Sequence, residues 1–295
     1  MSDILKLIGN TPLVELKHVN ANPNVRILAK LEGNNPGGSV KDRAAFGLIK
    51  GGLDSGLINK DSQLIEATSG NTGIALAMIA SMFGLKIELV MPENSSIERV
   101  LSMRAYGAKV TLTPAEQGME GAISYARDKV TNAGFVSLDQ FNNPNNPRMH
   151  YETTGPEIYR DTEGTVTHFV SAMGTTGTIM GVSRYLKEQN PDVQVIGAQP
   201  ADNAKIPGIR KWPAEFLPGI YQAERVDQLI EVTEAEATAM TRRLAREEGV
   251  FAGMSSGGAV HVAVQLASKL HSGVVVCIIC DRGDKYLSTN LFNEN

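Results

Sequence analysis

The alternation of apolar and helical segments between Gln63 and Leu138 limits the fold of this chain more than any other feature. Its order predicts strands at 64–67, 87–91, 110–112 and 135–138 and helices at 73–83, 97–106 and 119–132. Strands that alternate with helices in this way form a parallel sheet covered by helices. The alternation returns later, with strands expected at 168–173, 193–199 and 274–280 and helices at 155–160, 178–189, 233–248 and 259–270. We therefore expect an α/β protein, preceded by a short antiparallel pair at 14–16 and 26–31.

Two irregular segments suggest how the chain is divided. A length of 295 residues suits two domains or one large one. The turn-rich segment from Asn142 to Pro147 is the strongest break in the pattern. We expect a smaller α/β domain over residues 35–145 and a larger one formed by residues 1–34 and 146–295, with the functional site in the cleft between them. A second irregular segment, 201–223, holds three prolines and two glycines and is expected to be a functional loop.

The charge distribution narrows the class of ligand. The chain has 28 basic and 32 acidic residues, a net charge of −4, and no run of more than two basic residues. This argues against nucleic acid or a membrane surface as a partner and favours a small neutral or anionic metabolite. The first residues lack a signal-peptide core, and even the longest apolar runs, such as Val274 to Cys280, are too short to span a membrane. We expect a cytoplasmic protein.

The two cysteines, Cys277 and Cys280, are predicted to be free thiols. Both fall on the expected strand 274–280, where three residues separate two alpha carbons by about 10 Å and turn the side chains to opposite faces. A disulfide needs alpha carbons within about 7 Å of each other. The five histidines are scattered singly along the chain, which does not match the spacing of zinc ligands. We expect no bound metal.

Lys41 is the candidate nucleophile. It follows an Asn-Pro-Gly-Gly turn, and Ser39 with Asp42 three residues later is typical of a helix N-cap with a capping box. This places Lys41 in the first turn of a helix, where the positive end of the helix dipole disfavours a cation. A neutral amine at that position is able to attack a carbonyl.

Two glycine-containing loops are candidate anion sites, because each leads from a strand into a helix start. They are Thr68–Gly73 and Gly174–Thr178, and Ser255–Gly258 has a similar composition. The second loop lacks the Gly-x-Gly-x-x-Gly spacing of a dinucleotide site, and no Gly-Lys-Ser/Thr of a P-loop is present. One amine with two anion sites indicates an aldehyde cofactor that carries a phosphate and a substrate that carries a carboxylate.

Four motifs in this order resemble the cysteine synthase family of fold type II pyridoxal-phosphate enzymes. They are Ile8–Leu13, Asn35–Arg43, Thr68–Gly73 and Gly174–Thr178. The resemblance covers nearly the whole chain. It implies a fold similar to the tryptophan synthase β subunit, with two α/β domains of mostly parallel sheets flanked by helices and pyridoxal 5′-phosphate between them.

The resemblance also implies a role for each matching residue. Lys41 would hold the cofactor aldehyde covalently and serve as general base and acid, while Asn71 would bind the ring hydroxyl and Ser255 the pyridine nitrogen. The cofactor phosphate would be held by Gly174, Thr175, Thr176, Gly177 and Thr178. The carboxylate of the amino-acid substrate would be bound by Thr68, Ser69, Thr72 and Gln140.

The reaction implied by the resemblance is a β-replacement that makes L-cysteine from O-acetyl-L-serine and sulfide, carried out by a homodimer. The segment Pro207–Pro213 with Arg210, and the segment Cys277–Asp284 with Cys280, resemble the branch of the family that also uses thiosulfate to make S-sulfocysteine. A guanidinium at the site entrance would favour such a dianion. A cystathionine synthase or a serine/threonine dehydratase shares these motifs, and a non-catalytic scaffold is a further alternative. A visible absorption spectrum with and without O-acetylserine separates the enzyme from the scaffold.

Overall fold

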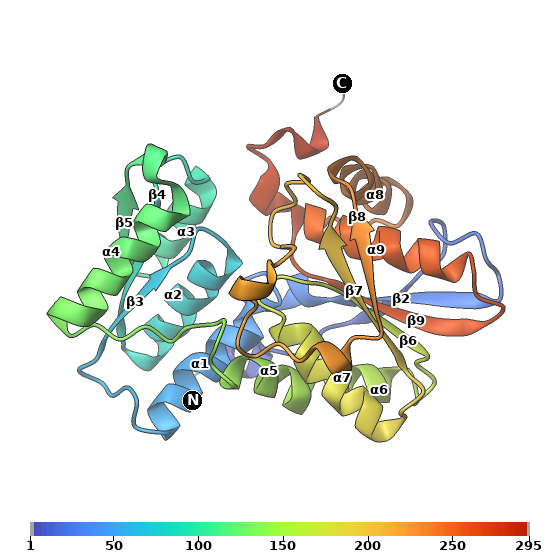
Figure 1. The fold of residues 1–295 in the computed structure, drawn as a ribbon, viewed down its shortest axis with the longest axis horizontal. Coiled ribbons are helices and arrows are strands. Elements are labelled where there is room, and N and C mark those ends of the chain that lie inside the picture. The colour runs from blue at the N-terminus through green and yellow to red at the C-terminus, as the bar shows by residue number, and fades with distance from the viewer. Residues whose placement is uncertain (1–2, 294–295) are drawn as a thin grey trace.

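A computed structural model describes residues 3–293, and within them the chain forms two separate sheets (Figure 1). The smaller sheet has the order β3-β4-β5, and all its strands are parallel. It consists of β3 (Gln63–Ala67), β4 (Lys86–Pro92) and β5 (Lys109–Thr113). The helices that alternate with these strands are α2 (Asn71–Phe83), α3 (Ile97–Ala105) and α4 (Gly118–Ala133). The predicted parallel α/β architecture is confirmed for this part of the chain.

The larger sheet has the order β1-β2-β9-β6-β7-β8 and is parallel except for the predicted antiparallel pair of β1 with β2. Its strands are β1 (Leu13–Leu16), β2 (Val25–Leu31), β6 (His168–Ala172), β7 (Gln194–Pro200), β8 (Gln228–Val232) and β9 (Gly273–Ile279). Its helices are α5 (Asn145–Met149), α6 (Gly155–Asp161), α7 (Gly177–Gln189), α8 (Glu234–Glu247) and α9 (Met254–Ala267).

The larger sheet is buried on both faces. Val275, Cys277 and Ile279 of β9 belong to one apolar core cluster, whereas Val276 and Ile278 belong to another. Because successive side chains of a strand point to opposite faces, these two clusters lie on opposite sides of the sheet. Each face is therefore covered by a layer of helices, as Figure 1 shows.

We call the smaller sheet with its helices the smaller half of the molecule, and the larger sheet with its helices the larger half. Helix α1 (Lys41–Asp54) lies where these two halves meet (Figure 1). It packs against α2 of the smaller half and α5 of the larger half. A third core cluster lies between α1 and α2 and includes Leu48 and Ile49 of α1 and Leu76 and Ile79 of α2. The first residue of α1, Lys41, is thereby held at the junction of the two halves.

Several boundaries differ from the sequence-based expectation. The predicted strand at 135–138 forms only a single bridge, Val136 with Leu64, because the backbone amides of Leu138 and Asp139 turn to donate to the carboxylate of Glu66. The predicted break at 142–147 is irregular only as far as Pro144, because α5 begins at Asn145. From Asn145, α5 continues through a π-helical turn (His150–Thr154) into α6. Strand β8 was not predicted.

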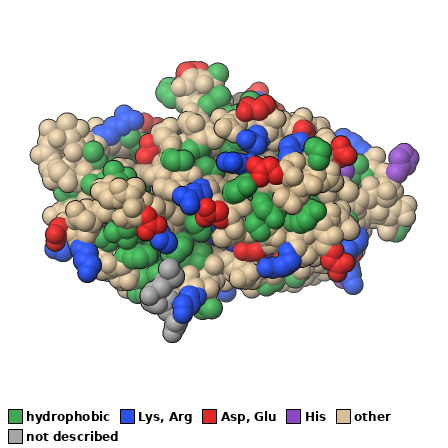
Figure 2. All heavy atoms as spheres, turned by 90° about the horizontal axis from the view of Figure 1, so that it is seen from below, with side chains coloured by type: hydrophobic (Ala, Val, Ile, Leu, Met, Phe, Trp, Pro, Cys, Tyr) green, Lys and Arg blue, Asp and Glu red, His purple; other side chains and the backbone are tan. Residues whose placement is uncertain are grey.

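The described residues contain no helix that is both long and apolar enough to cross a membrane. On the face seen in Figure 2, basic and acidic side chains are interspersed among apolar ones. That face therefore offers no continuous basic surface of the kind that binds nucleic acid.

Candidate active site

Most of the predicted site residues line one small cavity between the two halves. Among the residues that line it are Lys41, Asn71, Gly174, Thr175, Thr176, Thr178, Ser255 and Cys280. Lys41 and Asn71 are the first residues of α1 and α2, Thr178 lies in the first turn of α7, and Ser255 in the first turn of α9. Four helices of 13 or 14 residues thus begin at this cavity. Their N-terminal dipoles and free amides favour an anionic ligand.

The start of α1 differs from the predicted capping box. The N-cap is Val40, and the hydroxyl of Ser39 accepts a hydrogen bond from the backbone amide of Lys41 at 3.2 Å. The carboxylate of Asp42 accepts from the amide of Gly37 at 2.5 Å, so it closes the preceding turn. The amide of Val40 donates to the carbonyl of Cys280 at 2.8 Å. Lys41 is therefore anchored to the residue after β9 through the backbone of its neighbour Val40.

The loop Gly174–Thr178 has the backbone and side-chain features of a ligand-binding loop. Thr176 has φ 72°, a left-handed conformation that is costly for a β-branched residue. Its buried hydroxyl has no hydrogen-bond partner within residues 3–293. A side chain at Gly174 would come within 2.6 Å of the carbonyl of Gly208, and one at Gly177 would collide with Asn146. Strain and an unsatisfied buried donor together mark a place where a ligand oxygen accepts a hydrogen bond.

Two buried residues behind this loop were missed by sequence reasoning. Asn146 donates to the hydroxyl of Thr175 at 3.2 Å and to the carbonyl of Gln140 at 2.8 Å. His150 lies 3.3 Å from the hydroxyl of Thr178 through Nε2 and 2.9 Å from that of Thr154 through Nδ1. Burial and then the charge of Arg43 lower the pKa of His150 to about 3. The ring is therefore neutral at physiological pH.

The residues predicted to bind the substrate carboxylate lie beside the cavity at the start of α2. Thr72 donates to Gln140 at 2.8 Å, although 68 residues separate them in sequence. The carbonyl of Ser69 accepts from Arg99 at 3.2 Å, and the hydroxyl of Thr68 faces the amide of Gly70 at 3.5 Å. The four residues Thr68, Ser69, Thr72 and Gln140 thus form a polar edge next to Asn71.

Arg210 does not reach this cavity. It is exposed, its guanidinium stacks on Trp212 at 5.3 Å, and it lines a wide cleft of about 1130 Å³ between the loop after β7 and α4. Gly208 borders both spaces, so the cleft adjoins the cavity. The neighbouring Lys211 is bound by Asp202 and Glu231, each at 2.6 Å.

Cys280 lines the cavity beside Ser255. Burial raises the pKa of Cys280 to about 11, although the charge of Lys41 opposes this shift. The side chain is therefore a thiol at neutral pH and not a thiolate. Both cysteines are free, as predicted.

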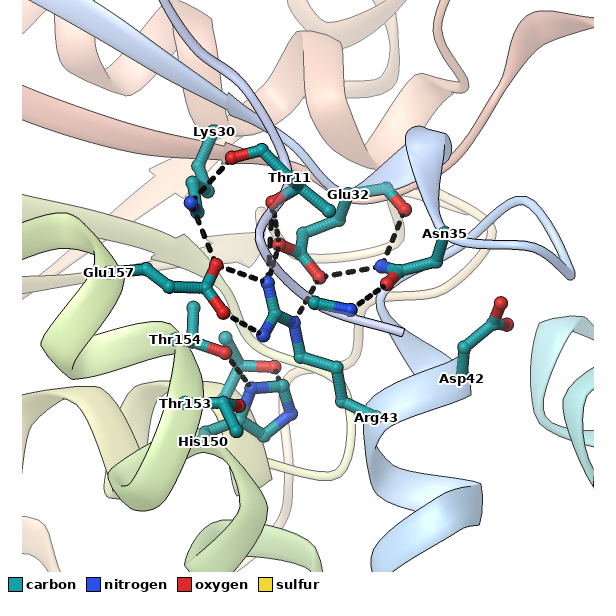
Figure 3. Close-up of polar contacts among 12 residues, drawn as sticks. Thr11, Lys30, Glu32, Asn35, Asp42, Arg43, His150, Thr153, Thr154 and Glu157 are labelled. Atoms are coloured by element: carbon teal, nitrogen blue, oxygen red, sulfur yellow. Dashed lines mark hydrogen bonds and ion pairs between the residues drawn. The ribbon is translucent and has the colours of Figure 1, made fainter. Parts of the chain in front are cut away.

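A buried ion network lies beside the first turn of α1 (Figure 3). Arg43 binds Glu32 at 2.7 Å and Glu157 at 2.7 Å, and Lys30 binds Glu157 at 2.8 Å. Burial alone would raise the pKa of Glu157, but the hydrogen bonds and charges of Arg43 and Lys30 lower it to about 2. The network links β2, α1 and α6, and it holds the helix that begins with Lys41 in place.

Fold and cavity together define an α/β enzyme that holds an anionic cofactor beside a lysine. Residues 4–281 match the model of the pyridoxal-phosphate dependent enzymes, and the chain belongs to that family. The cofactor of the family is pyridoxal 5′-phosphate, and the site fits it. The amine of Lys41 suits its aldehyde, and the unsatisfied hydroxyl of Thr176 with the start of α7 suits its phosphate.

The chain is also similar to individual proteins along its whole length. It is 55% identical over 291 residues to cysteine synthase B of Pseudomonas aeruginosa, which is 98% of this chain and 97% of that protein. A solved cysteine synthase of Entamoeba histolytica has a TM-score of 0.94 at 37% identity, covering 100% of this chain and 91% of that one. A solved O-ureido-L-serine synthase has a TM-score of 0.93 at 37% identity, covering 99% and 95%.

Proposed function

We propose that the protein makes L-cysteine from O-acetyl-L-serine and sulfide by a β-replacement that depends on pyridoxal 5′-phosphate. The observation that carries this proposal is a lysine placed where four helices begin, in a chain 55% identical along its length to a cysteine synthase B. When bound, the cofactor withdraws electrons from an amino acid, so that the α-proton becomes acidic and a β-substituent is able to leave.

Each group of residues in the cavity then has its own role in the reaction. Lys41 holds the cofactor covalently and moves the α-proton at Nζ. Ser255 offers a neutral hydroxyl to the pyridine nitrogen, which does not enforce a charged ring and so favours elimination over transamination. Gly174 to Thr178 hold the phosphate, with His150 and Asn146 supporting the hydroxyls of the loop.

Substrate binding is assigned to the polar edge at the start of α2. Thr68, Ser69, Thr72 and Gln140 bind the α-carboxylate, helped by the amides at the helix start. We propose that residues 35–145 form a domain that moves toward the rest of the chain when the carboxylate binds. Such closure excludes water, which would otherwise compete with sulfide.

A Lys41→Ala variant tests the assignment. It is expected to keep its thermal unfolding midpoint and to lose turnover, because both the covalent hold on the cofactor and the proton transfer depend on that amine. The visible spectrum of the wild type should shift on adding O-acetylserine. Assays with sulfide, thiosulfate and homocysteine distinguish a cysteine synthase from a cystathionine synthase. Substantial activity of the Lys41→Ala variant would refute the role of this lysine.

We also propose that thiosulfate is a second sulfur donor, which gives S-sulfocysteine. Arg210 supports this because it lies at the adjoining cleft and has no carboxylate partner within the described part of the chain, unlike Lys211. A guanidinium binds a dianion through charge and paired hydrogen bonds. Cys280 would shape the donor pocket as a neutral thiol.

Substitutions in the donor region test the second proposal. Arg210→Ala and Cys280→Ser should each lower kcat/KM for thiosulfate more than for sulfide and leave the KM for O-acetylserine unchanged. Lys211→Ala is the matched control, because its charge is already neutralised. Equal losses for both donors would exclude Arg210 and Cys280 from donor selection. From the family resemblance we further infer a cytoplasmic homodimer, which sedimentation and cell fractionation test.

A further inference from the structure

Asn71, Lys285, Asp281 and Tyr286 form a polar cluster at the wall of the cavity. The side-chain oxygen of Asn71 accepts a hydrogen bond from Lys285 Nζ at 2.9 Å, and its Nδ2 donates to Asp281 Oδ2 at 2.7 Å. The phenol of Tyr286 donates to the same carboxylate oxygen at 2.6 Å. Asn71 begins α2, whereas the other three residues follow β9. The cluster therefore joins the two halves of the molecule at the cofactor cavity.

The partners of Asn71 allow only one orientation of its amide. An ammonium can only donate hydrogen bonds, and a carboxylate can only accept them. If the amide were flipped, its oxygen would face the carboxylate of Asp281 and its NH₂ would face the ammonium of Lys285, so both contacts would become repulsive. One hydrogen of Nδ2 is used by Asp281, and the described residues supply no acceptor for the other.

Lys285 also holds the turn in front of Lys41. Its ammonium donates to the carbonyls of Gly37 at 2.9 Å and Gly38 at 3.1 Å. Gly38 has φ +79°, and a side chain there would come within 3.3 Å of Lys285 Nζ. Burial lowers the pKa of Lys285, whereas the charges of Asp281 and Asp42 oppose this shift. One side chain thus connects the two elements that present Lys41 and Asn71 to the cavity.

We propose that Lys285 and Asp281 are positioning residues that hold the Asn71 amide in one orientation, with its free N–H directed at an anionic oxygen of the bound cofactor. The inference rests on the proposed function only in placing the ring oxygen of the cofactor beside Asn71. Because the amide of Asn71 is held in this orientation, its N–H always faces that oxygen and stabilises the deprotonated form of the oxygen. An amide free to flip presents its own oxygen part of the time, which repels the same group.

The test compares Lys285→Met with Lys285→Arg and with Arg282→Met. Arg282 is the matched control, because it is exposed, pairs with Asp284 and carries the same charge in the same segment. Lys285→Met should weaken the binding of pyridoxal 5′-phosphate to the cofactor-free protein about tenfold, as expected for one lost hydrogen bond to a charged group. Lys285→Arg should restore most of the affinity, and Arg282→Met should leave it unchanged.

A double-mutant cycle separates positioning from general support of the fold. If Lys285 acts through Asn71, Lys285→Met should cause no further loss of cofactor affinity in an Asn71→Ala background. Additive losses, or an unchanged affinity in Lys285→Met, would overturn the proposal. If Lys285→Met does not fold, the isosteric Asp281→Asn tests the same coupling. Turnover of the wild type with O-acetylserine and sulfide is measured separately, so a failure of the proposed function is distinguishable.

Discussion

Two adjacent threonines of the loop Gly174–Thr178 have opposite structural roles. Thr176 adopts a left-handed conformation, with φ 72°, and its buried hydroxyl has no partner in residues 3–293. Thr175 has no such strain, and its hydroxyl lies between the amide of Asn146 at 3.2 Å and the backbone amide of Gly177 at 3.4 Å. Thr175 therefore stabilises the cofactor-free protein. Thr176 is held in a left-handed conformation whose free-energy cost is offset only when a ligand binds to its hydroxyl.

Replacing each threonine by glycine should reveal this difference. Thr176→Gly relieves the left-handed strain and should cost the cofactor-free protein less stability than Thr175→Gly does, by about 1 kcal/mol. Cofactor affinity should fall more in Thr176→Gly, because it loses the hydroxyl that is free to bind the phosphate. Denaturant unfolding of the cofactor-free proteins and cofactor titrations measure the two effects. The opposite ranking in both measurements would mean that Thr176 is a structural residue.

Among the elements, those with a clear local period were predictable. The alternating strands and helices match the structure except at 135–138, and the antiparallel pair β1 and β2 and the capping box of α8 also match it. Strand β8 was not predicted because its sequence, Gln-Leu-Ile-Glu-Val, is mostly exposed and follows an irregular loop. The segment Ser255–Gly258 resembles a loop in composition but lies in the first turns of α9. Its small residues allow α8 to pack closely, since a side chain at Gly257 would collide with Thr241.

Local turn, cap and glycine patterns predicted Lys41 and the loops Thr68–Gly73 and Gly174–Thr178 as parts of the candidate site, and the family resemblance added the other site residues and the individual roles. The positions of Lys41, Asn71 and Thr178 follow from these patterns and from the resemblance, and the structure brings them to one cavity. The supporting contacts could not be predicted, because they join residues that are distant in sequence. Lys285 lies 214 residues from Asn71, and His150 follows the segment 142–147, which was interpreted as a break between domains. No local periodicity carries information about such pairs.

The capping box of α8 provides a test at this scale. Thr233 accepts from the amide of Glu236 at 3.2 Å, and the carboxylate of Glu236 accepts from the amide of Thr233 at 2.8 Å. Thr233 is exposed, so Thr233→Ala removes the cap without leaving a cavity and should lower the free energy of unfolding by about 1 kcal/mol. Thr238→Ala, in the helix interior, is the control and should not destabilise. No loss in Thr233→Ala would show that the box is dispensable.

In the molecule as a whole, two buried groups near α1 oppose each other in their dependence on pH. His150 has a pKa lowered to about 3, so it binds its proton more readily in the unfolded chain, and its contribution to stability is lost as the pH falls below about 6.5. Burial raises the pKa of Asp42 to about 7, against the hydrogen bond from Gly37 and the charge of Lys285. Asp42 therefore binds its proton more readily in the folded state, and it adds stability as the pH falls below 7.

Substitution of either group should leave the pH dependence of stability that comes from the other group. Relative to wild type, His150→Gln should gain stability as the pH falls from about 6.5 to 4, by up to about 1.4 kcal/mol per pH unit. Asp42→Asn should lose stability over the same interval. Denaturant unfolding of the cofactor-free proteins at several pH values measures both slopes. His271→Gln at the surface is the control. Parallel pH profiles for all four proteins would contradict the opposing roles.

Strand β9 has a consequence for how the protein is made. Among the strands in residues 3–293 it is the last that the ribosome adds, yet it lies inside the larger sheet, between β2 and β6. Strands β3 to β5 follow one another in the chain and are able to associate during synthesis. Strands β2 and β6, in contrast, each keep one unpaired edge until β9 is made. The start of α1 at Lys41 is also completed only after β9 is made, because the amide of Val40 donates to the carbonyl of Cys280, the residue that follows β9. A nascent chain that stalls before Gly273 therefore exposes the unpaired edges of β2 and β6. Unpaired strand edges promote aggregation, and chaperones protect chains in this state.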